Sequence, residues 1–188
     1  MALPVIHRSP PPIRAESRSP AVAPGYGQAV ILLDTSGSMD SPVAGGKRRI
    51  DVLADILRVV LPDAPEARLI AFSDTVVAIA APADLPEPSG STALHAALEY
   101  ATRLRPRRVI IISDGEPDDR GAALRAARAL HCPVDAFHAG DEDARAAIAF
   151  LRNLCLCGHG VGHATVADLR NPAKLAGELR LLLAGPRR

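Results

Sequence analysis

Two short apolar runs, each followed by an aspartate, constrain the fold of this chain more than any other feature. Ala29–Leu33 leads directly into Asp34, and Val109–Ile112 leads through Ser113 into Asp114. Short apolar runs that end in turn-forming residues are typical of buried parallel strands. In an open α/β sheet, ligands bind beyond the carboxyl ends of the strands. We therefore expect both aspartates at the edge of a sheet where a binding site forms.

Hydroxyl side chains accompany the two carboxylates. Ser36 and Ser38 follow at alternate positions after the first strand, and Thr92 lies in a loop of small residues that opens a helix. Hard oxygen donors suit Mg2+, and the lack of Cys and His among them disfavours zinc. The alternative is that each of the three segments only forms an ordinary turn. The candidate metal ligands are Asp34, Ser36, Ser38, Thr92 and Asp114.

The three segments together resemble the metal-ion-dependent adhesion site (MIDAS) of the von Willebrand factor A (vWA) family. The sequence has D-x-S-x-S at 34–38, then a Thr in a Gly/Ser loop, then S-D-G at 113–115, in the order that the family uses. The resemblance covers the chain from about Gln28 to Leu183. One departure is the loop Ser89–Thr92, which reads Ser-Gly-Ser-Thr where many relatives have Gly-Gly-Thr. The additional serine of this loop is not counted as a ligand.

The resemblance implies a role for each ligand. Ser36 and Ser38 are expected to bind the ion directly, and Thr92 to do so when the site is engaged. Asp34 and Asp114 are expected to bind largely through water and to hydrogen-bond the hydroxyls. The ion, Mg2+ or its substitute Mn2+, would then keep net positive character and an open position. A carboxylate from a partner protein can fill that position.

The implied function is a non-catalytic, Mg2+-dependent protein–protein interaction module that acts as an adaptor or assembly factor. Intracellular bacterial vWA proteins often work beside MoxR-type AAA+ ATPases, so such an ATPase is one expected partner. Two alternatives remain open: a scaffold whose metal site is purely structural, and a Mg2+-dependent phosphatase of the haloacid-dehalogenase type. The phosphatase would need a general-acid aspartate where this chain has Ser36. A serine hydrolase is disfavoured because the sequence has no G-x-S-x-G motif.

Strands and helices alternate along the chain, which predicts a doubly wound α/β sheet with helices on both faces. Right-handed crossovers favour six strands in the order 3-2-1-4-5-6, mostly parallel, with one antiparallel hairpin strand at an edge. The expected strands are Ala29–Leu33, Arg68–Phe72, Thr75–Ala80, Val109–Ile112, Val134–Ala139 and Ala164–Val166. The expected helices are Lys47–Leu61, Ala93–Leu104, Arg120–Leu130, Glu142–Leu156 and Asn171–Leu183.

Composition restricts the organisation and the partners. Residues 27–188 are expected to form one vWA domain, preceded by a flexible proline-rich tail at 1–26. A net charge of +1 gives no general attraction to nucleic acid or to anionic membranes. No run reaches the roughly 18 apolar residues that a membrane span needs. The start of the chain does not read as a signal peptide, and three cysteines argue against a disulfide framework. These features indicate a cytoplasmic protein, and the high content of Ala, Arg and Leu is compatible with a bacterial source.

Two other groups of residues were considered as sites. Cys155, Cys157, His159 and His163 lie within nine residues, but their spacing is not one of the usual zinc patterns. The first of them falls on the apolar face of a helix, so we expect it in the core. Basic residues cluster at Lys47–Arg49 and at 103–108. They are expected to be solvated helix ends and loop edges, with a partner-docking patch as the alternative.

Overall fold

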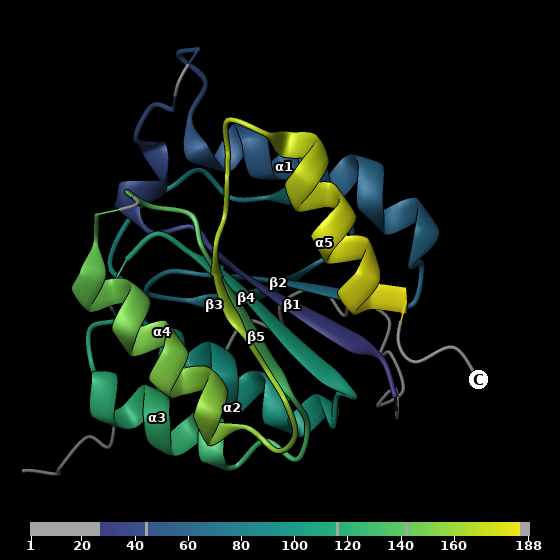
Figure 1. Ribbon diagram of the computed structural model, residues 1–188, viewed down its shortest axis with the longest axis vertical. Helices are drawn as coiled ribbons and strands as arrows, with labels where there is room; N and C mark the ends of the chain where they lie inside the picture. Colours follow the sequence, from purple (N-terminus) through teal and green to yellow (C-terminus); the bar gives the residue numbers. More distant parts are fainter. Residues whose placement is uncertain (1–26, 44, 116, 142, 185–188) are drawn as a thin grey trace, which may run out of the picture.

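The computed structural model describes residues 27–184, apart from 44, 116 and 142. The predicted tail, 1–26, lies outside the described residues. The strands are β1 (Ala29–Asp34), β2 (Arg68–Phe72), β3 (Val76–Ile79), β4 (Arg108–Ser113), β5 (Val134–His138) and β6 (Ala164–Val166). They form one sheet in the order β3-β2-β1-β4-β5-β6 (Figure 1). Only β3 is antiparallel to its neighbour, which confirms the predicted strand order and the antiparallel edge.

Helices cover both faces of this sheet. They are α1 (Arg49–Val60), α2 (Leu94–Leu104), α3 (Arg120–Arg128), α4 (Arg145–Cys157) and α5 (Pro172–Ala184). One face is covered by α1 and α5, and the other by α2, α3 and α4 (Figure 1). This arrangement confirms the predicted doubly wound α/β fold. Within the described residues, none of the helices has the length and apolar character that crossing a membrane requires.

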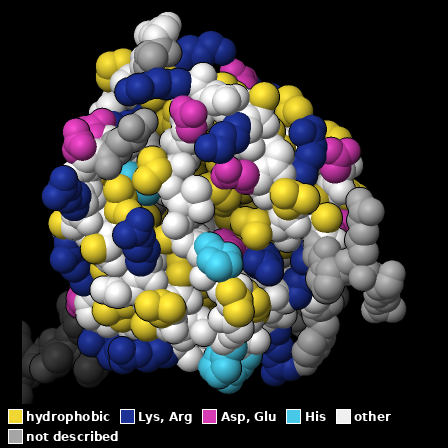
Figure 2. All heavy atoms as spheres, in the orientation of Figure 1, with side chains coloured by type: hydrophobic (Ala, Val, Ile, Leu, Met, Phe, Trp, Pro, Cys, Tyr) yellow, Lys and Arg dark blue, Asp and Glu magenta, His cyan; other side chains and the backbone are white. Residues whose placement is uncertain are grey.

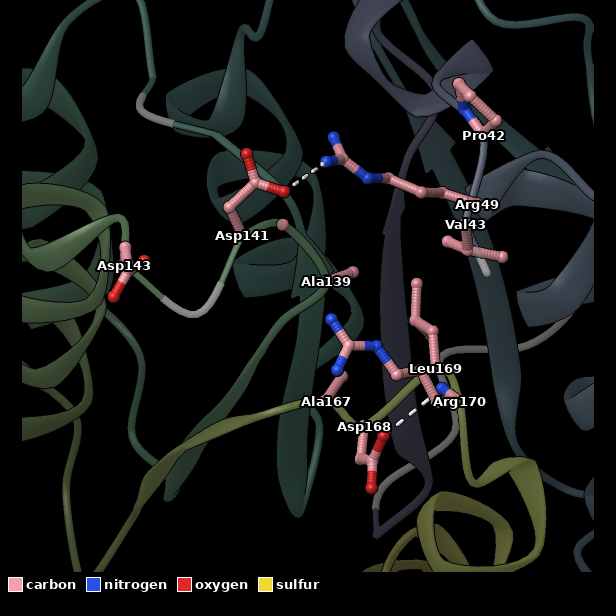
Figure 3. A pocket seen from close by; sticks show the side chains of 11 residues that line it. Pro42, Val43, Arg49, Ala139, Asp141, Asp143, Ala167, Asp168, Leu169 and Arg170 are labelled. Carbon is pink, nitrogen blue, oxygen red and sulfur yellow. Dashed lines mark hydrogen bonds and ion pairs between the residues drawn. The ribbon is translucent and has the colours of Figure 1, made fainter. Parts of the chain in front are cut away.

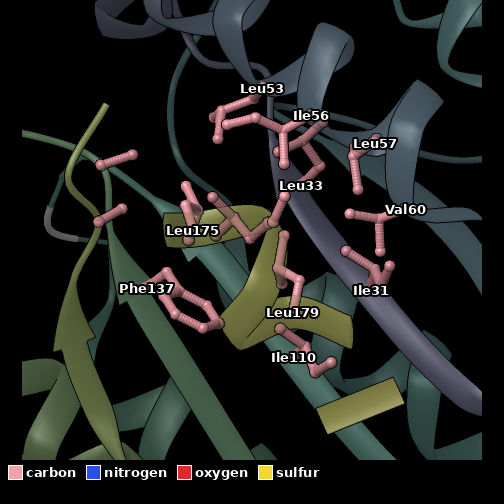
Figure 4. Close-up of a cluster of buried hydrophobic side chains, with 14 of the residues drawn as sticks. Ile31, Leu33, Leu53, Ile56, Leu57, Val60, Ile110, Phe137, Leu175 and Leu179 are labelled. Carbon is pink, nitrogen blue, oxygen red and sulfur yellow. The ribbon is translucent and has the colours of Figure 1, made fainter. Parts of the chain in front are cut away.

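The pleat of β1 explains why its residues Ala29–Leu33 are all apolar. Successive side chains of a strand point to opposite faces of the sheet. Ile31 and Leu33 pack in the cluster beneath α1 and α5, whereas Val30 and Leu32 pack in the cluster beneath α2, α3 and α4. Figure 4 shows the first cluster, where aliphatic side chains from both helices meet the strand. Burying each such side chain contributes about 1.5–3 kcal/mol.

All five helices differ from their predicted bounds, by one to three residues, and the largest shifts are at the starts of α1 and α4 and at the end of α3, which stops at Arg128 instead of Leu130. The first was expected from Lys47, but α1 begins at Arg49 because Arg48 is extended and pairs with Pro42 in an isolated bridge. After α1 the chain tightens into the 3-10 turn η2 (Leu61–Asp63), whose second residue is a proline. The segment expected to be helical from 142 becomes helix only at the start of α4. These differences leave the strand ends and the loops after them where the topology requires.

Candidate metal centre

Asp34 and Ser113 end two neighbouring central strands and are bonded side chain to side chain. Leu33 of β1 pairs with Ile112 of β4, so the next residues face each other at the carboxyl edge. The Ser113 hydroxyl donates to Asp34 Oδ2 at 2.5 Å, and the Ser36 N–H donates to Asp34 Oδ1 at 2.8 Å. Asp34 is completely buried. Ser113, which the sequence analysis did not count as a site residue, therefore helps to position this carboxylate.

A line of hydrogen-bonded oxygens joins the loop after β1, which carries Ser36 and Ser38, to the loop after β4, which carries Asp114. The hydroxyl oxygens of Ser36 and Ser38 lie 3.1 Å apart, and Ser38 Oγ donates to Asp114 Oδ1 at 2.7 Å. Between them the chain enters the 3-10 turn η1 (Gly37–Asp40). With Asp34 bonded to the main chain of Ser36, four of the five predicted ligands meet at the carboxyl ends of β1 and β4.

Thr92, the fifth predicted ligand, is joined to this cluster through the main chain. The N–H of Gly37 donates to the carbonyl of Gly90 at 3.2 Å, which ties the Thr92 loop to the first loop. The N–H of Thr92 donates to Asp118 Oδ1 at 3.1 Å, and the residue is 8% exposed. Within the described residues, its hydroxyl forms no hydrogen bond with the other four predicted ligands. Its segment thus lies at the site, and its side chain stands apart from the hydrogen-bonded line.

Two carboxylates hold the Thr92 loop from outside. The Ser91 hydroxyl lies 2.7 Å from both Asp74 Oδ1 and Asp118 Oδ2, and the Ser91 N–H donates to Asp74 Oδ1 at 2.6 Å. These bonds lower the pKa of Asp74. Gly90 has a φ of +74°, and a Cβ there would collide with the Asp74 carboxylate. Ser91 and Gly90 therefore shape the loop.

Burial controls the protonation of Asp34. Removal from water raises its pKa from 3.8 to about 6, and the repulsion of Asp114 adds a smaller increase. Hydrogen bonds from Ser113 and Ser36 oppose the rise without cancelling it. No Lys or Arg in the described part of the chain forms an ion pair with this carboxylate. Asp34 is thus a buried carboxylate whose charge is stabilised only by hydrogen bonds from uncharged groups.

Arg49, at the start of α1, supplies the positive charge that contacts the site. Its guanidinium forms an ion pair with Asp114 Oδ2 and reaches Asp141 Oδ1 at 3.2 Å. The Arg49 side chain is 14% exposed and that of Asp114 is 1% exposed, so solvent screens the pair weakly. The prediction that Lys47–Arg49 is merely a solvated helix end is wrong for Arg49. Arg48 stays at the solvated end of the helix, where it forms ion pairs with three exposed carboxylates.

A hollow of about 470 Å³ opens beside Arg49, away from the serines. Arg49 and Asp141 meet at its upper part, and Leu169 and Arg170 lie below them in the view of Figure 3. Asp143 and Asp168 are also in its lining, so the hollow carries both signs of charge. Arg49 therefore lies between the line of oxygens and a polar recess.

The donor set fits a hard divalent cation. Asp34 is buried without a cationic partner, and a metal ion beside it would supply the missing positive charge. Hydroxyl and carboxylate oxygens are the ligands that Mg2+ prefers. Arg49 would repel the ion, but it occupies Oδ2 of Asp114, whereas Oδ1 faces Ser38. The residues expected to hold the ion are Asp34, Ser36, Ser38, Thr92 and Asp114.

The Cys and His residues near the end of α4 separate in the structure. Cys155 is 2% exposed, which confirms it as a core residue, and burial raises the pKa of its thiol to about 12. His159 Nδ1 lies 2.7 Å from the carbonyl oxygen of Leu130. Cys157 is half-buried and His163 is exposed. Among the residues that the structure describes, no group of three or more His, Cys, Asp or Glu side chains is arranged to hold a metal.

The sequence matches no family model, and no curated protein matches it. Several solved structures do share its fold. An aerotolerance-related membrane protein from Bacteroides fragilis matches with a TM-score of 0.57 at 17% identity, over 81% of this chain and 97% of that chain. The PilB minor pilin from Streptococcus sanguinis, as its D319A mutant, matches with a TM-score of 0.67 at 12% identity, over 88% and 63%. The vWF domain of the type V pili tip protein Mfa5 from Porphyromonas gingivalis gives 0.53 at 11%, over 87% and 97%.

These similarities establish a vWA-like fold for this chain. The identities are 11–17%, so they show the fold alone. This chain spans 63% of the PilB structure and nearly all of the Bacteroides fragilis and Mfa5 structures.

Proposed function

We propose that this chain is a non-catalytic protein-interaction module whose partner binding depends on Mg2+. The observation that carries this proposal is the hydrogen-bonded line from Ser36 through Ser38 to Asp114, beside the buried carboxylate of Asp34. It lies at the carboxyl edge of the two central strands, where α/β sheets bind ligands. Thr92 completes the proposed ligand set, and Mn2+ should replace Mg2+.

The chemistry of the ligands supports an interaction site. Three of the five donors are neutral hydroxyls, and the two carboxylates are already engaged as hydrogen-bond acceptors: Asp34 with Ser113, and Asp114 with Ser38. An ion held this way keeps much of its positive charge. A carboxylate from another protein is then the natural last ligand. The proposed partner therefore presents an exposed Asp or Glu.

The rim of the site restricts the surroundings of that carboxylate. This rim consists of Asp118 and Asp119, which lie between β4 and α3, and of Asp141 and Asp143, which precede α4. Glu116 also follows β4 in the sequence, but it lies outside the described residues. An extended acidic surface on the partner would be repelled by this rim. The approaching Asp or Glu should therefore sit in a neutral or basic patch.

A MoxR-type AAA+ ATPase remains the proposed partner class, and the cytoplasm the proposed location. The first rests on the resemblance of the sequence motifs to intracellular bacterial vWA proteins. The second is supported by the cysteines, since Cys132, Cys155 and Cys157 are all free. Secreted domains of this size more often pair such residues.

Affinity capture with and without EDTA tests the proposal. Immobilised wild-type protein should retain its partner in Mg2+ or Mn2+ and lose it in EDTA. Ser36→Ala should weaken the capture without unfolding the domain, and Asp114→Ala should abolish it. Asp143→Asn is the matched control, because it removes an exposed rim carboxylate outside the ligand set. A partner retained equally in EDTA and by Asp114→Ala would show that the site is only structural and that the interaction surface lies elsewhere.

A further inference from the structure

The outer surface of α3 and α4 carries five arginines and no acidic residue. Arg120, Arg125 and Arg128 belong to α3, and Arg145 and Arg152 to α4. The chain has 22 basic and 21 acidic residues, so without these five it would have 17 basic residues against 21 acidic ones. Figure 2 shows Lys and Arg side chains gathered on the side where α3 and α4 lie, with few carboxylates among them. Positive charge is therefore concentrated on one helical face, called here the α3–α4 face.

The two helices form one continuous surface. They pack side by side, and the guanidinium of Arg120 lies over the ring of Phe150 of α4, 5.7 Å from its centroid. Arg145 and Arg152 are seven residues apart, which is about two helical turns, so both lie on the same side of α4. Both are exposed, as is Arg128 of α3. An extended chain lying across the two helices can therefore meet several of these arginines at once.

Among the described residues, three of these arginines have no side-chain partner. Arg128, Arg145 and Arg152 form no side-chain hydrogen bond or ion pair within the described residues. On the opposite face of the sheet, Arg58 and Arg180 each pair with a nearby carboxylate. Arg128, Arg145 and Arg152 of the α3–α4 face thus differ from these two paired arginines.

Helix stabilisation explains only part of this pattern. Cations are favourable in the last turn of a helix, where Arg125 and Arg128 of α3 lie. Arg145, by contrast, is the first residue of α4, where the helix dipole disfavours a cation. Arg152 lies in the middle of the same helix. The two arginines of α4 therefore do not serve its macrodipole.

We propose that the α3–α4 face binds an acidic segment of a partner protein. The planar guanidinium group pairs with carboxylates through two parallel hydrogen bonds. Leu156 follows Arg152 by one turn and is 79% exposed, so an apolar side chain of the segment has a contact beside the charges. A protein segment supplies both kinds of group. The only aromatic side chain within α3 and α4 is Phe150, which is buried, so this face offers no platform for stacking bases.

A labelled peptide tests this proposal, namely a run of glutamates that ends in leucine. Its fluorescence anisotropy is measured with wild-type protein at low salt, in EDTA. The double variant Arg128→Glu/Arg152→Glu should weaken binding at least about tenfold. The matched control, Arg58→Glu/Lys174→Glu, makes the same change in net charge on α1 and α5 and should stay within about twofold. Asp114→Ala should also bind like wild type, because this surface is separate from the candidate metal centre.

Several outcomes would overturn the proposal. If the control variant weakened peptide binding equally, the loss would result from the change in net charge and not from the α3–α4 face. Loss of peptide binding in Asp114→Ala, or a need for Mg2+, would place the peptide at the metal centre instead. If a short DNA duplex bound the α3–α4 face more tightly than the peptide, the face would be a nucleic-acid surface. If anionic vesicles bound it more tightly, the face would be a membrane surface. Circular dichroism of each variant checks that the fold is retained.

Discussion

Two groups of potential metal ligands stand out in the sequence, and the fold treats them in opposite ways. The oxygen group comes from three segments far apart in the chain, yet Ser36, Ser38 and Asp114 form one hydrogen-bonded line. The sulfur and nitrogen group lies within the nine residues from Cys155 to His163, yet its members separate. Place in the topology therefore indicates a metal site better than closeness in sequence does.

The physical reason lies in the two kinds of element. A parallel sheet gathers the carboxyl ends of its strands at one edge, so loops from distant segments meet there. A helix rotates by about 100° per residue, so residues two apart face nearly opposite directions. Cys155 accordingly enters the core, while Cys157 is only half-buried at its edge. The helix thus places the two cysteines in different environments, and His159 and His163 lie beyond its end.

The largest expected effect concerns the charge in the oxygen group. Asp34→Asn should stabilise the metal-free protein by about 3 kcal/mol at about pH 8, since each unit of pKa shift corresponds to about 1.4 kcal/mol. The pKa of Asp34 is raised to about 6 from 3.8, so the folded state binds this proton more tightly than the unfolded chain. Stability is therefore lost as the pH rises through this window.

Urea unfolding in EDTA measures this effect. The difference between Asp34→Asn and wild type should be full above about pH 6 and should vanish near pH 4. Asp143→Asn is the matched control and should change stability by less than about 0.5 kcal/mol, because that carboxylate is exposed. A variant no more stable than wild type at the higher pH would mean that the buried charge of Asp34 is compensated.

The second effect concerns the core position of the sulfur group. Cys155→Ser should destabilise the protein by about 2 kcal/mol, because it places a hydroxyl among apolar side chains. Cys157→Ser, at the half-buried position, should stay within about 0.5 kcal/mol. Thermal or urea unfolding of both variants measures the contrast. Equal losses for the two would show that the two cysteines share one environment, against the burial that the structure gives them.

The third effect concerns the cation beside the oxygen group. Arg49→Ala should raise the affinity for Mn2+ about fivefold, because it removes a positive charge next to the ion and releases Asp114. Arg49→Lys keeps the charge and should remain close to wild type. Calorimetric titration of both variants measures the change. Weaker binding by Arg49→Ala would mean that this arginine supports the ligands more than it repels the ion.

The smallest expected effect concerns zinc binding by the sulfur and nitrogen group. Protein purified without added metal should contain no stoichiometric zinc, because Cys155, Cys157, His159 and His163 do not converge. Elemental analysis of the purified chain measures this directly. One zinc ion per chain would overturn the interpretation of Cys155 as a core residue.

The fold could be predicted from the sequence because two patterns are clear in it: apolar runs for the strands and helical spacing of apolar residues for the helices. Both central strands contain an unbroken apolar run, Ala29–Leu33 and Val109–Ile112, and the helices between them have apolar residues at helical spacing. Strand order then follows from the handedness of crossovers. The start of α1 was placed two residues early, since Lys47 and Arg48 continue a basic run into the helix. Local composition cannot show that Arg48 is held extended.

The site residues that follow directly from the ends of the strands could be predicted. Those whose role depends on a side-chain contact between distant segments could not. The carboxylates and serines at the ends of β1 and β4 follow from the topology. Ser113 was missed as a positioning group because its contact with Asp34 depends on strand register. Arg49 was missed because its long side chain crosses from α1 to Asp114, sixty-five residues away in the chain. A basic residue in the first turn of a helix near this edge is the only signal that the sequence offers.

Calorimetric titration with Mn2+ tests the central claim, that the oxygen group is a metal centre. Wild-type protein should bind one ion per chain, and the same heat should be absent in Asp34→Asn and in Asp114→Ala. Asp143→Asn should bind like wild type, and circular dichroism should show that all variants keep the fold. Unchanged Mn2+ affinity in both Asp34→Asn and Asp114→Ala would contradict the assignment of these residues as a metal site.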